Sequence, residues 1–303
     1  MEQPLVSVLT VTRNRGNLLR RCVNSVLSQT YKNIEHIVVD GASDDNTDEV
    51  MAEFNDERLY FVKLKSNWPI KETLDHGISL CKGKYITFLD SDDEYLPEKV
   101  EKQVRLIESL SEDYGFVYCW MTYYDDKTKK ELRLHSPHLR GFVADKVIST
   151  PVISGTPTLM FRVEVLRELK GWKSPDETGI ISDWELCSRA CQHYNVDFIP
   201  ESLVNVYVNH GSIRQSESNK YYTETSKRIV KFHKYFLNRY QDFFNKFPKN
   251  GWYHYSGLLT NYLVLGNYKE SRKYYWLLCK SRPSLSSFIS PLKPLIKKIL
   301  RWK

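Results

Sequence analysis

Residues 84–93 read KYITFLDSDD, an apolar run of aromatic and β-branched residues that ends abruptly in three carboxylates. The run from Tyr85 to Leu89 is typical of a strand buried on both faces of a sheet. Asp90 and Asp92 stand two residues apart, so both can lean to one side where the chain leaves the strand. Hard oxygen ligands of this kind suit Mg²⁺ or Mn²⁺ carrying a diphosphate.

Three strand patterns, each followed by apolar residues at helical spacing, precede this segment. The strands are expected at residues 5–12, 34–40 and 59–64. Alternation of strand and helix predicts a parallel, doubly wound sheet, in which ligands bind at the carboxyl ends of the strands. Polar clusters at 12–14 and 40–43 fall at two of those ends. One such cluster is usually an ordinary turn, but three at successive strand ends favour a phosphate or nucleotide site.

Four segments together carry a resemblance to a known family. They are residues 7–15 (SVLTVTRNR), 25–31 (SVLSQTY), 37–47 (IVVDGASDDNT) and 83–93 (GKYITFLDSDD). In order and spacing they resemble family 2 glycosyltransferases with the GT-A fold, and residues 158–162, 171–172, 182–185 and 199–203 resemble the acceptor half of that family. The resemblance implies an α/β fold with a Rossmann-like, mostly parallel sheet flanked by helices and an α-helical C-terminal appendage.

The same resemblance implies an enzyme, a hexosyl- or N-acetylhexosaminyl-transferase. It would move a sugar from a nucleotide-diphosphate sugar, by default a UDP-sugar, to a hydroxyl of a glycan or lipid-linked acceptor, with inversion at the anomeric carbon. Synthesis of a bacterial surface polysaccharide is the expected setting. The donor sugar, the acceptor and the linkage depend on pocket shape, which a single sequence does not reveal.

Matched to the motifs of the family, seven residues would bind the donor nucleotide: Val11, Thr12, Arg13, Asp40, Ser43, Asp90 and Ser91. A divalent metal, Mn²⁺ or Mg²⁺, would be held by Asp92 with Asp90, and His210 is a further candidate ligand. A metal there would act as a Lewis acid on the leaving nucleoside diphosphate.

Asp183 matches the catalytic aspartate of the family, the base that takes the proton from the acceptor hydroxyl. Taken alone, this aspartate would be interpreted as a helix N-cap, whose loss costs about 1 kcal/mol. Glu185 is the second candidate for the base. The sequence departs from the family pattern at two places, which bear on donor identity. Ser182 stands where an acidic residue commonly precedes the base, and residues 68–71 (WPIK) stand where the family has a loop with Gly and Tyr.

Charge divides the chain into an acidic and a basic part. Residues 1–219 hold 26 Lys+Arg against 34 Asp+Glu, whereas residues 220–303 hold 18 against 3. We expect a catalytic domain at 1–218, with a nucleotide-binding half at 1–110 and an acceptor half at 111–218, and a basic helical region at 219–303. The basic region favours an anionic partner.

Residues 291–303 alternate apolar and basic side chains. This pattern suits either a helix on an anionic membrane surface or a helix docked on the protein, and the sequence does not decide between them. The N-terminus has no leader pattern, so the expected location is the cytoplasm, including the inner face of the cell membrane.

Two other classes of protein are alternatives to the glycosyltransferase interpretation. A different Mg²⁺-dependent nucleotide enzyme, such as a nucleotidyltransferase, would want a glycine-rich phosphate loop after the first strand, and residues 12–16 supply a poor one. A nucleic-acid-binding module would leave Asp40, Asp92 and Asp183 without a role, so no nucleic acid partner is expected. The six cysteines lack CxxC spacing and are interpreted as reduced, buried thiols.

Overall fold

The structure is a computed structural model that describes residues 3–172, 183–209 and 219–282. It divides into two compact units. Unit 1 comprises residues 1–144, 152–174 and 181–211, and unit 2 comprises 145–151, 175–180 and 212–303.

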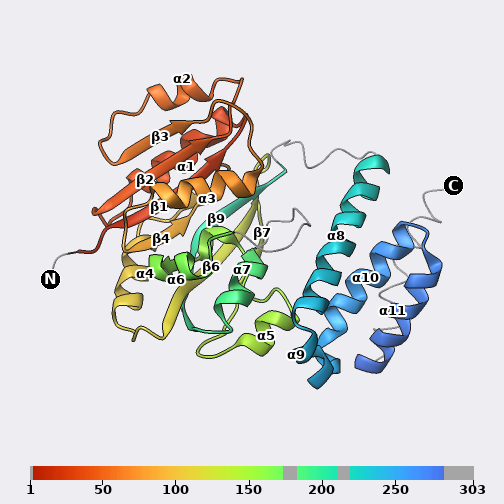
Figure 1. Ribbon diagram of the computed structural model, residues 1–303. Helices are drawn as coiled ribbons and strands as arrows, with labels where there is room; N and C mark the ends of the chain where they lie inside the picture. The colour runs from red at the N-terminus through yellow and green to blue at the C-terminus, as the bar shows by residue number, and fades with distance from the viewer. Residues whose placement is uncertain (1–2, 173–182, 210–218, 283–303) are drawn as a thin grey trace. The chain divides into compact units, whose positions relative to one another are not determined.

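Unit 1 is built on one sheet with the strand order β3-β2-β1-β4-β8-β6-β9-β5, to which β7 adds by pairing with β6 (Figure 1). The strands are β1 (Val6–Thr12), β2 (Ile34–Asp40), β3 (Leu59–Lys63), β4 (Tyr85–Phe88), β5 (Glu94–Tyr95), β6 (Tyr114–Asp125), β7 (Glu131–His135), β8 (Met160–Arg162) and β9 (Asn195–Val208). The helices are α1 (Gly16–Leu27), α2 (Thr47–Ala52), α3 (Ile70–Leu80), α4 (Lys99–Glu108), α6 (Val163–Glu168) and α7 (Asp183–Ala190), with a 3₁₀ turn at Thr156–Thr158.

The first four long strands are parallel, as the alternating pattern predicts. Thr12 pairs with Asp40 and Leu9 with Phe88, so the carboxyl ends of β1, β2 and β4 lie at one edge of the sheet. Beyond β4 the sheet is mixed, because β8 runs antiparallel to both β4 and β6 while β6 and β9 are parallel. The expectation of parallel strands therefore holds best for the half that the sequence places at 1–110.

Helices cover both faces of the parallel strands because side chains alternate along them. Val6 and Val8 of β1 join the apolar cluster that contains Val23 of α1 and Val104 of α4. Leu9 points the other way, where a Cβ added at Gly77 of α3 would lie 2.5 Å from its Cδ1. The glycine therefore lets α3 approach β1 closely.

Strand β9 is not among the strands that the sequence predicts, and Pro200 and Glu201 interrupt its apolar pattern. The structure removes them from the ladder: Cys119 pairs with Ile199, but the next residue, Trp120, pairs with Ser202. Both interrupting residues are exposed, so the strand continues past a bulge.

Two helices of unit 1 begin after turns that hold their first residues. Before α2, Asp45 Oδ1 accepts the hydrogen bond from the Thr47 amide, at 3.1 Å. Helix α4 begins at Lys99, so Pro97 precedes its first turn instead of opening it.

Unit 2 is helical, as expected for the basic region. It contains α8 (Asn219–Arg239), α9 (Gln241–Lys246), a 3₁₀ turn at Pro248–Gly251, α10 (Trp252–Val264) and α11 (Tyr268–Ser281), together with most of α5 (Ala144–Ser149). Gly266, with φ of 72°, turns the chain between α10 and α11, and Asn267 caps α11 by accepting from the Glu270 amide at 3.1 Å. The basic amphipathic segment 291–303 lies outside the described residues. Among the helices that are described, none is long and apolar enough to cross a membrane.

Two buried imidazoles connect the helices of unit 2. His254 Nε2 lies 3.2 Å from the carbonyl oxygen of Ile148, and its Nδ1 lies 3.2 Å from Nδ1 of His233. Because a carbonyl only accepts, Nε2 of His254 carries the proton, and its Nδ1 accepts from His233. These hydrogen bonds require a neutral His254, and burial disfavours a charge on His233.

We expect unit 2 to lose stability in mild acid. Burial lowers the pKa of His233 to about 4 and that of His254 to about 3. Below the ordinary value of 6.5 the unfolded chain therefore binds more protons than the folded one, and each histidine should remove about 2 kcal/mol of unfolding free energy between pH 7 and 5. Hydrogen exchange of the α8 and α10 amides at the two pH values measures this loss. The exposed control His193→Gln should leave it unchanged, and equal protection at both pH values would contradict the prediction.

Candidate active site

The ends of β1 and β2 form a tightly hydrogen-bonded pair of loops. Asp40 is fully buried, and its carboxylate accepts hydrogen bonds from the Ser43 amide, at 3.0 Å, and from the Ser43 hydroxyl. The Ser43 hydroxyl in turn accepts from the Asn14 amide at 2.8 Å. Asn14 and Ala42 both adopt left-handed backbone, with φ of 53° and 61°. Such conformations are costly outside glycine and cluster at functional sites.

Two predicted nucleotide-binding residues lie directly beside this pair of loops. The Thr12 carbonyl accepts from the Gly41 amide at 2.9 Å, and a Cβ added at Gly41 would lie 3.7 Å from Cβ and Cδ of Arg13. The exposed Arg13 side chain therefore lies over the Gly41 backbone. Val11 is half-buried just before them in β1.

The acidic segment after β4 begins at the same edge of the sheet. The Leu89 amide donates to the Leu9 carbonyl of β1 at 3.0 Å, and the Asp93 amide donates to the Asp90 carbonyl at 3.0 Å. This turn leaves Asp90 exposed and Asp92 half-buried, whereas Asp93 is buried. Burial and the charges of Asp90 and Asp92 together raise the pKa of Asp93 well above its ordinary value.

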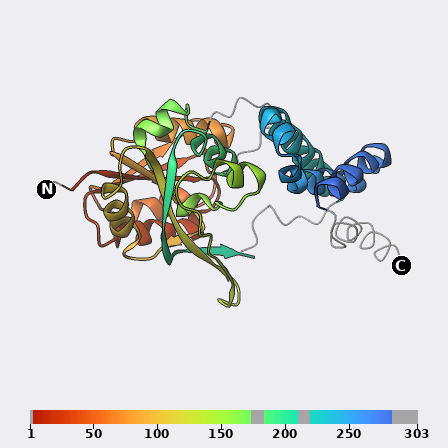
Figure 2. The same cartoon turned by 90° about the horizontal axis from the view of Figure 1, so that it is seen from below.

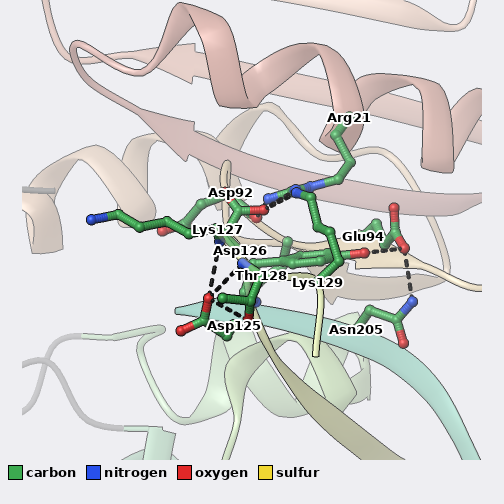
Figure 3. A network of polar contacts seen from close by, with 11 residues as sticks. Arg21, Asp92, Glu94, Asp125, Asp126, Lys127, Thr128, Lys129 and Asn205 are labelled. Carbon is green, nitrogen blue, oxygen red and sulfur yellow. Dashed lines mark hydrogen bonds and ion pairs between the residues drawn. The ribbon is translucent and has the colours of Figure 1, made fainter. Parts of the chain in front are cut away.

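Two arginines from the start of α1 face the acidic segment. Arg15 Nη1 lies 2.9 Å from Asp92 Oδ2. Arg21 donates to the backbone carbonyl of Asp92 and, at 2.8 Å, to Asp126 Oδ1, and Figure 3 shows it bridging these groups. Its guanidinium also lies 3.6 Å from the centre of the Tyr207 ring. Arg21 thus joins α1 to β9 and to the turn between β6 and β7.

The β6–β7 hairpin and the end of β9 complete this side of unit 1 (Figures 2 and 3). Asp125 Oδ1 accepts from the amides of Lys127 and Thr128, and its Oδ2 accepts from Asn209 Nδ2 at 2.6 Å. The Tyr207 amide donates to Asp93 Oδ1 at 2.9 Å. Strand β9 therefore contacts the acidic segment directly, and the hairpin is joined to the residue after β9 through Asp125.

Asp183 opens α7, and its carboxylate is held by backbone amides. Oδ1 accepts from the Trp184 amide at 2.7 Å, and Oδ2 accepts from the Gly155 amide. Burial raises the pKa of this carboxyl, although the amide donors oppose the shift. Burial raises the pKa of Tyr123 of β6, and the charges of Asp183 and Asp93 add to this shift.

Glu185 does not fit its predicted role as an alternative base. It is 3% exposed, and both of its oxygens accept from Nε of Arg189, at 2.8 and 3.0 Å. Arg189 also donates to the carbonyls of Leu169 and Gly171. The interpretation of Glu185 as a fallback base is therefore wrong: its carboxylate is the counter-charge of a buried arginine that ties α7 to the end of α6.

Two predicted nucleotide-binding residues carry buried hydroxyls that make no hydrogen bond within the described part of the chain. They are Thr12 Oγ1 and Ser91 Oγ, in residues that are 3% and 1% exposed. Unsatisfied buried hydroxyls are uncommon in folded proteins and call for a partner. Thr12 is the last residue of β1 and Ser91 lies just after β4, at the strand ends where the ligand is expected.

A metal at the carboxyl ends of these strands would have few protein ligands. No group of three or more His, Cys, Asp or Glu side chains among the described residues is arranged to hold a metal. The carboxylates of Asp90 and Asp92 nonetheless offer the hard oxygens that Mg²⁺ and Mn²⁺ prefer. His210 lies outside the described residues, so its prediction is not addressed.

The sequence did not single out Arg15, Arg21, Asp126 or Tyr207. Each makes its contact with a residue far away in the chain, and a solvated face of α1 would have the same arginine pattern. The one available signal was the acidic cluster, which needs nearby cations.

The sheet, its acidic strand ends and the aspartate at the start of α7 together define an α/β protein of the GT-A class. The fold is shared with S. aureus TarS 1-349 in complex with UDP-GlcNAc, with a TM-score of 0.61 and 16% identity over 89% of each chain. It is shared as well with the mannosyltransferase PcManGT of Pyrobaculum calidifontis in complex with GDP-Man and Mn²⁺, with a TM-score of 0.60 and 15% identity over 98% of this chain and 88% of that one.

Residues 7–170 match glycosyl transferase family 2, and the chain belongs to that family. A curated relative, the putative teichuronic acid biosynthesis glycosyltransferase TuaG of Bacillus subtilis, is 33% identical over 45% of this chain and 54% of its own length. The first curated relatives that match are covered over only 39% of their length. The predicted family and fold class are confirmed.

We expect Arg21→Gln to destabilise the protein by about 2 kcal/mol, because it removes charge-assisted hydrogen bonds to Asp92 and Asp126 and a cation–π contact. Urea unfolding of the variant measures this. Arg20→Gln is the matched control, since the neighbouring Arg20 forms only an exposed pair with Glu53 and its loss should not change the midpoint. Equal midpoints for the two variants would show that the Arg21 network contributes little to stability.

Proposed function

We propose that this protein is an inverting glycosyltransferase that moves a sugar from a nucleotide-diphosphate sugar to a hydroxyl group. One observation carries the proposal: Thr12, Asp40 with Ser43, and the segment from Asp90 to Asp92 lie at or just after the carboxyl ends of three adjacent parallel strands. In open α/β sheets this edge is where ligands bind. Family membership and the two nucleotide-sugar complexes with the same fold support the assignment.

The nucleoside would be bound by the loops after β1 and β2. Asp40, fixed by Ser43, would accept a hydrogen bond from the base, and Arg13 would stack on it with its guanidinium plane. The buried hydroxyls of Thr12 and Ser91 would gain from the donor the partners that they lack in the described protein. A preformed loop of this kind reduces the entropy lost on binding.

The acidic segment would hold a divalent metal. Asp92, with Asp90, would supply two carboxylates, and the diphosphate of the donor would supply the further oxygen ligands that the described residues do not offer. The metal would stabilise the negative charge on the departing nucleoside diphosphate.

Asp183 would remove the proton from the attacking hydroxyl. Its amide contacts fix the orientation of the carboxylate, and its raised pKa brings it closer to the operating pH, which favours a general base. Direct attack assisted by one such base would invert the anomeric centre.

The acceptor that we propose is a glycan or lipid-linked glycan in bacterial surface polysaccharide synthesis. The name of TuaG supports this setting. Residues 220–303 contain 18 basic and 3 acidic residues, and this positive charge would attract an anionic acceptor or the inner face of an anionic membrane.

A nucleotidyltransferase function is disfavoured by the loop after β1. Its Gly16 amide is already bonded to Asp45 Oδ2 at 3.0 Å, and a Cβ added at Gly16 would lie 2.4 Å from Asn46 Oδ1. The start of α1 is therefore closed by the next loop and does not offer its amides to a triphosphate.

The donor class can be identified by a thermal-shift panel of UDP, GDP, dTDP, CDP and ADP, each with and without Mn²⁺. We expect UDP with Mn²⁺ to raise the melting temperature most, because a ligand that binds only the folded state stabilises it by mass action. Metal without nucleotide is the control. A larger shift for another nucleotide would change the donor class, and no shift with any of them would contradict the proposed donor site.

Asp183→Asn and Glu185→Gln should fail in different ways. The first should lower kcat by 10²- to 10⁴-fold, as expected for loss of a general base, with little change in stability. The second leaves buried Arg189 without its counter-charge and should cost about 3–5 kcal/mol of stability while the folded fraction keeps its kcat. Initial rates beside urea unfolding measure both effects. Full activity of Asp183→Asn would overturn the assignment of the base.

A further inference from the structure

A cation already lies on the carboxylate that the proposed function gives to the metal. Arg15 Nη1 is 2.9 Å from Asp92 Oδ2, and the two side chains are only 26% and 13% exposed. The pair joins the loop after β1, where the nucleotide is proposed to bind, to the loop after β4. A partly buried pair of this kind is held more firmly than an ion pair in open water.

The backbones on both sides of this pair are fixed by other contacts. The Arg15 carbonyl accepts from the amides of Leu18 and Leu19, which form the first turn of α1. The Asp92 carbonyl accepts from Arg21, which is itself fixed by Asp126 and the Tyr207 ring. The Arg15 side chain can therefore leave Asp92 without moving either loop.

The acidic segment requires positive charge in the absence of a metal. Asp90, Asp92 and Asp93 lie within four residues, and like charges at this spacing repel one another. A divalent cation and the Arg15 guanidinium would compete for the same oxygen of Asp92. A guanidinium released from a carboxylate is well suited to phosphate, which offers the same paired acceptors.

We propose that Arg15 is a counter-cation built into the donor site: it neutralises Asp92 in the free protein, is displaced from that carboxylate by the divalent metal, and then binds the diphosphate of the donor. The inference rests on the proposed function, which assigns Asp92 to the metal. Arg15 therefore lowers the affinity for metal alone and raises the affinity for metal and nucleotide together. By linkage, each of the two ligands then strengthens the binding of the other.

Calorimetric titration of Mn²⁺ and of UDP into the full chain tests this scheme. Relative to the wild type, Arg15→Gln should bind Mn²⁺ alone about tenfold more tightly and UDP in the presence of Mn²⁺ about tenfold more weakly, as expected for removing one charge at this distance. The coupling between the two ligands should fall accordingly. Arg20→Gln, which removes a surface arginine from the same helix, should match the wild type in all titrations.

A second measurement uses proteins that keep the positive charge. In the wild type, the side-chain Nε–H NMR signal of Arg15, identified by its loss in Arg15→Lys, should shift when Mg²⁺ is added and shift again when UDP follows. A purely structural arginine would respond to neither.

The outcomes separate this inference from the proposed function. If Arg15→Gln binds Mn²⁺ alone no more tightly than the wild type, or the Arg15 signal ignores Mg²⁺, the inference is wrong while the metal site and the transferase proposal stand. If no variant binds Mn²⁺ even with UDP, the assignment of Asp92 to the metal fails, and the inference fails with it. Sugar-transfer activity, measured separately, tests the transferase proposal in either case.

Discussion

Mutual repulsion among three carboxylates at the end of β4 is the constraint on which the rest of unit 1 depends. Asp90, Asp92 and Asp93 follow a short buried strand, so the chain has little freedom to spread them apart. Arginines at and near the start of α1, and a backbone amide of β9, contact this acidic segment. Because these come from distant segments, the acidic cluster draws α1, the β6–β7 hairpin and β9 into one arrangement (Figure 3).

The two loops on the nucleotide side are organised by a different means. The Asp40 carboxylate accepts from Ser43, and the Ser43 hydroxyl accepts from the backbone amide of Asn14. The same loops contain left-handed backbone at Asn14 and Ala42. Neutral and charge-assisted hydrogen bonds fix this half of the site before any ligand arrives. The acidic half contains the ion pair of Arg15 with Asp92, which under our proposal a divalent metal displaces. The two halves of this edge of the sheet therefore differ in the kind of contact that orders them.

The parallel strands, and the position of the candidate site residues at or just after their carboxyl ends, could be predicted from sequence, because they depend on local patterns. Where an apolar run such as 85–88 gives way to polar residues, the sequence itself indicates the carboxyl end of the strand. The contacts of Arg15, Arg21 and Tyr207 could not be predicted, since they join segments far apart in the chain. Glu185 shows the same limit: its carboxylate follows Asp183 closely in sequence, yet one helix turn directs it to Arg189 in the core. Similarity of position therefore did not distinguish a base from a structural counter-charge.

The difference in proposed role between Asp183 and Glu185 has a physical reason. A general base must keep a high enough pKa to accept a proton and must be held by groups that survive its protonation. The amides of Gly155 and Trp184 meet both needs, because neutral donors orient a carboxylate without pinning it to the charged form as strongly as an arginine does. A carboxylate paired with Arg189 would lose a buried ion pair whenever it accepted a proton. The environments of the two carboxylates therefore support the proposed role of Asp183 as the base and give Glu185 a structural role.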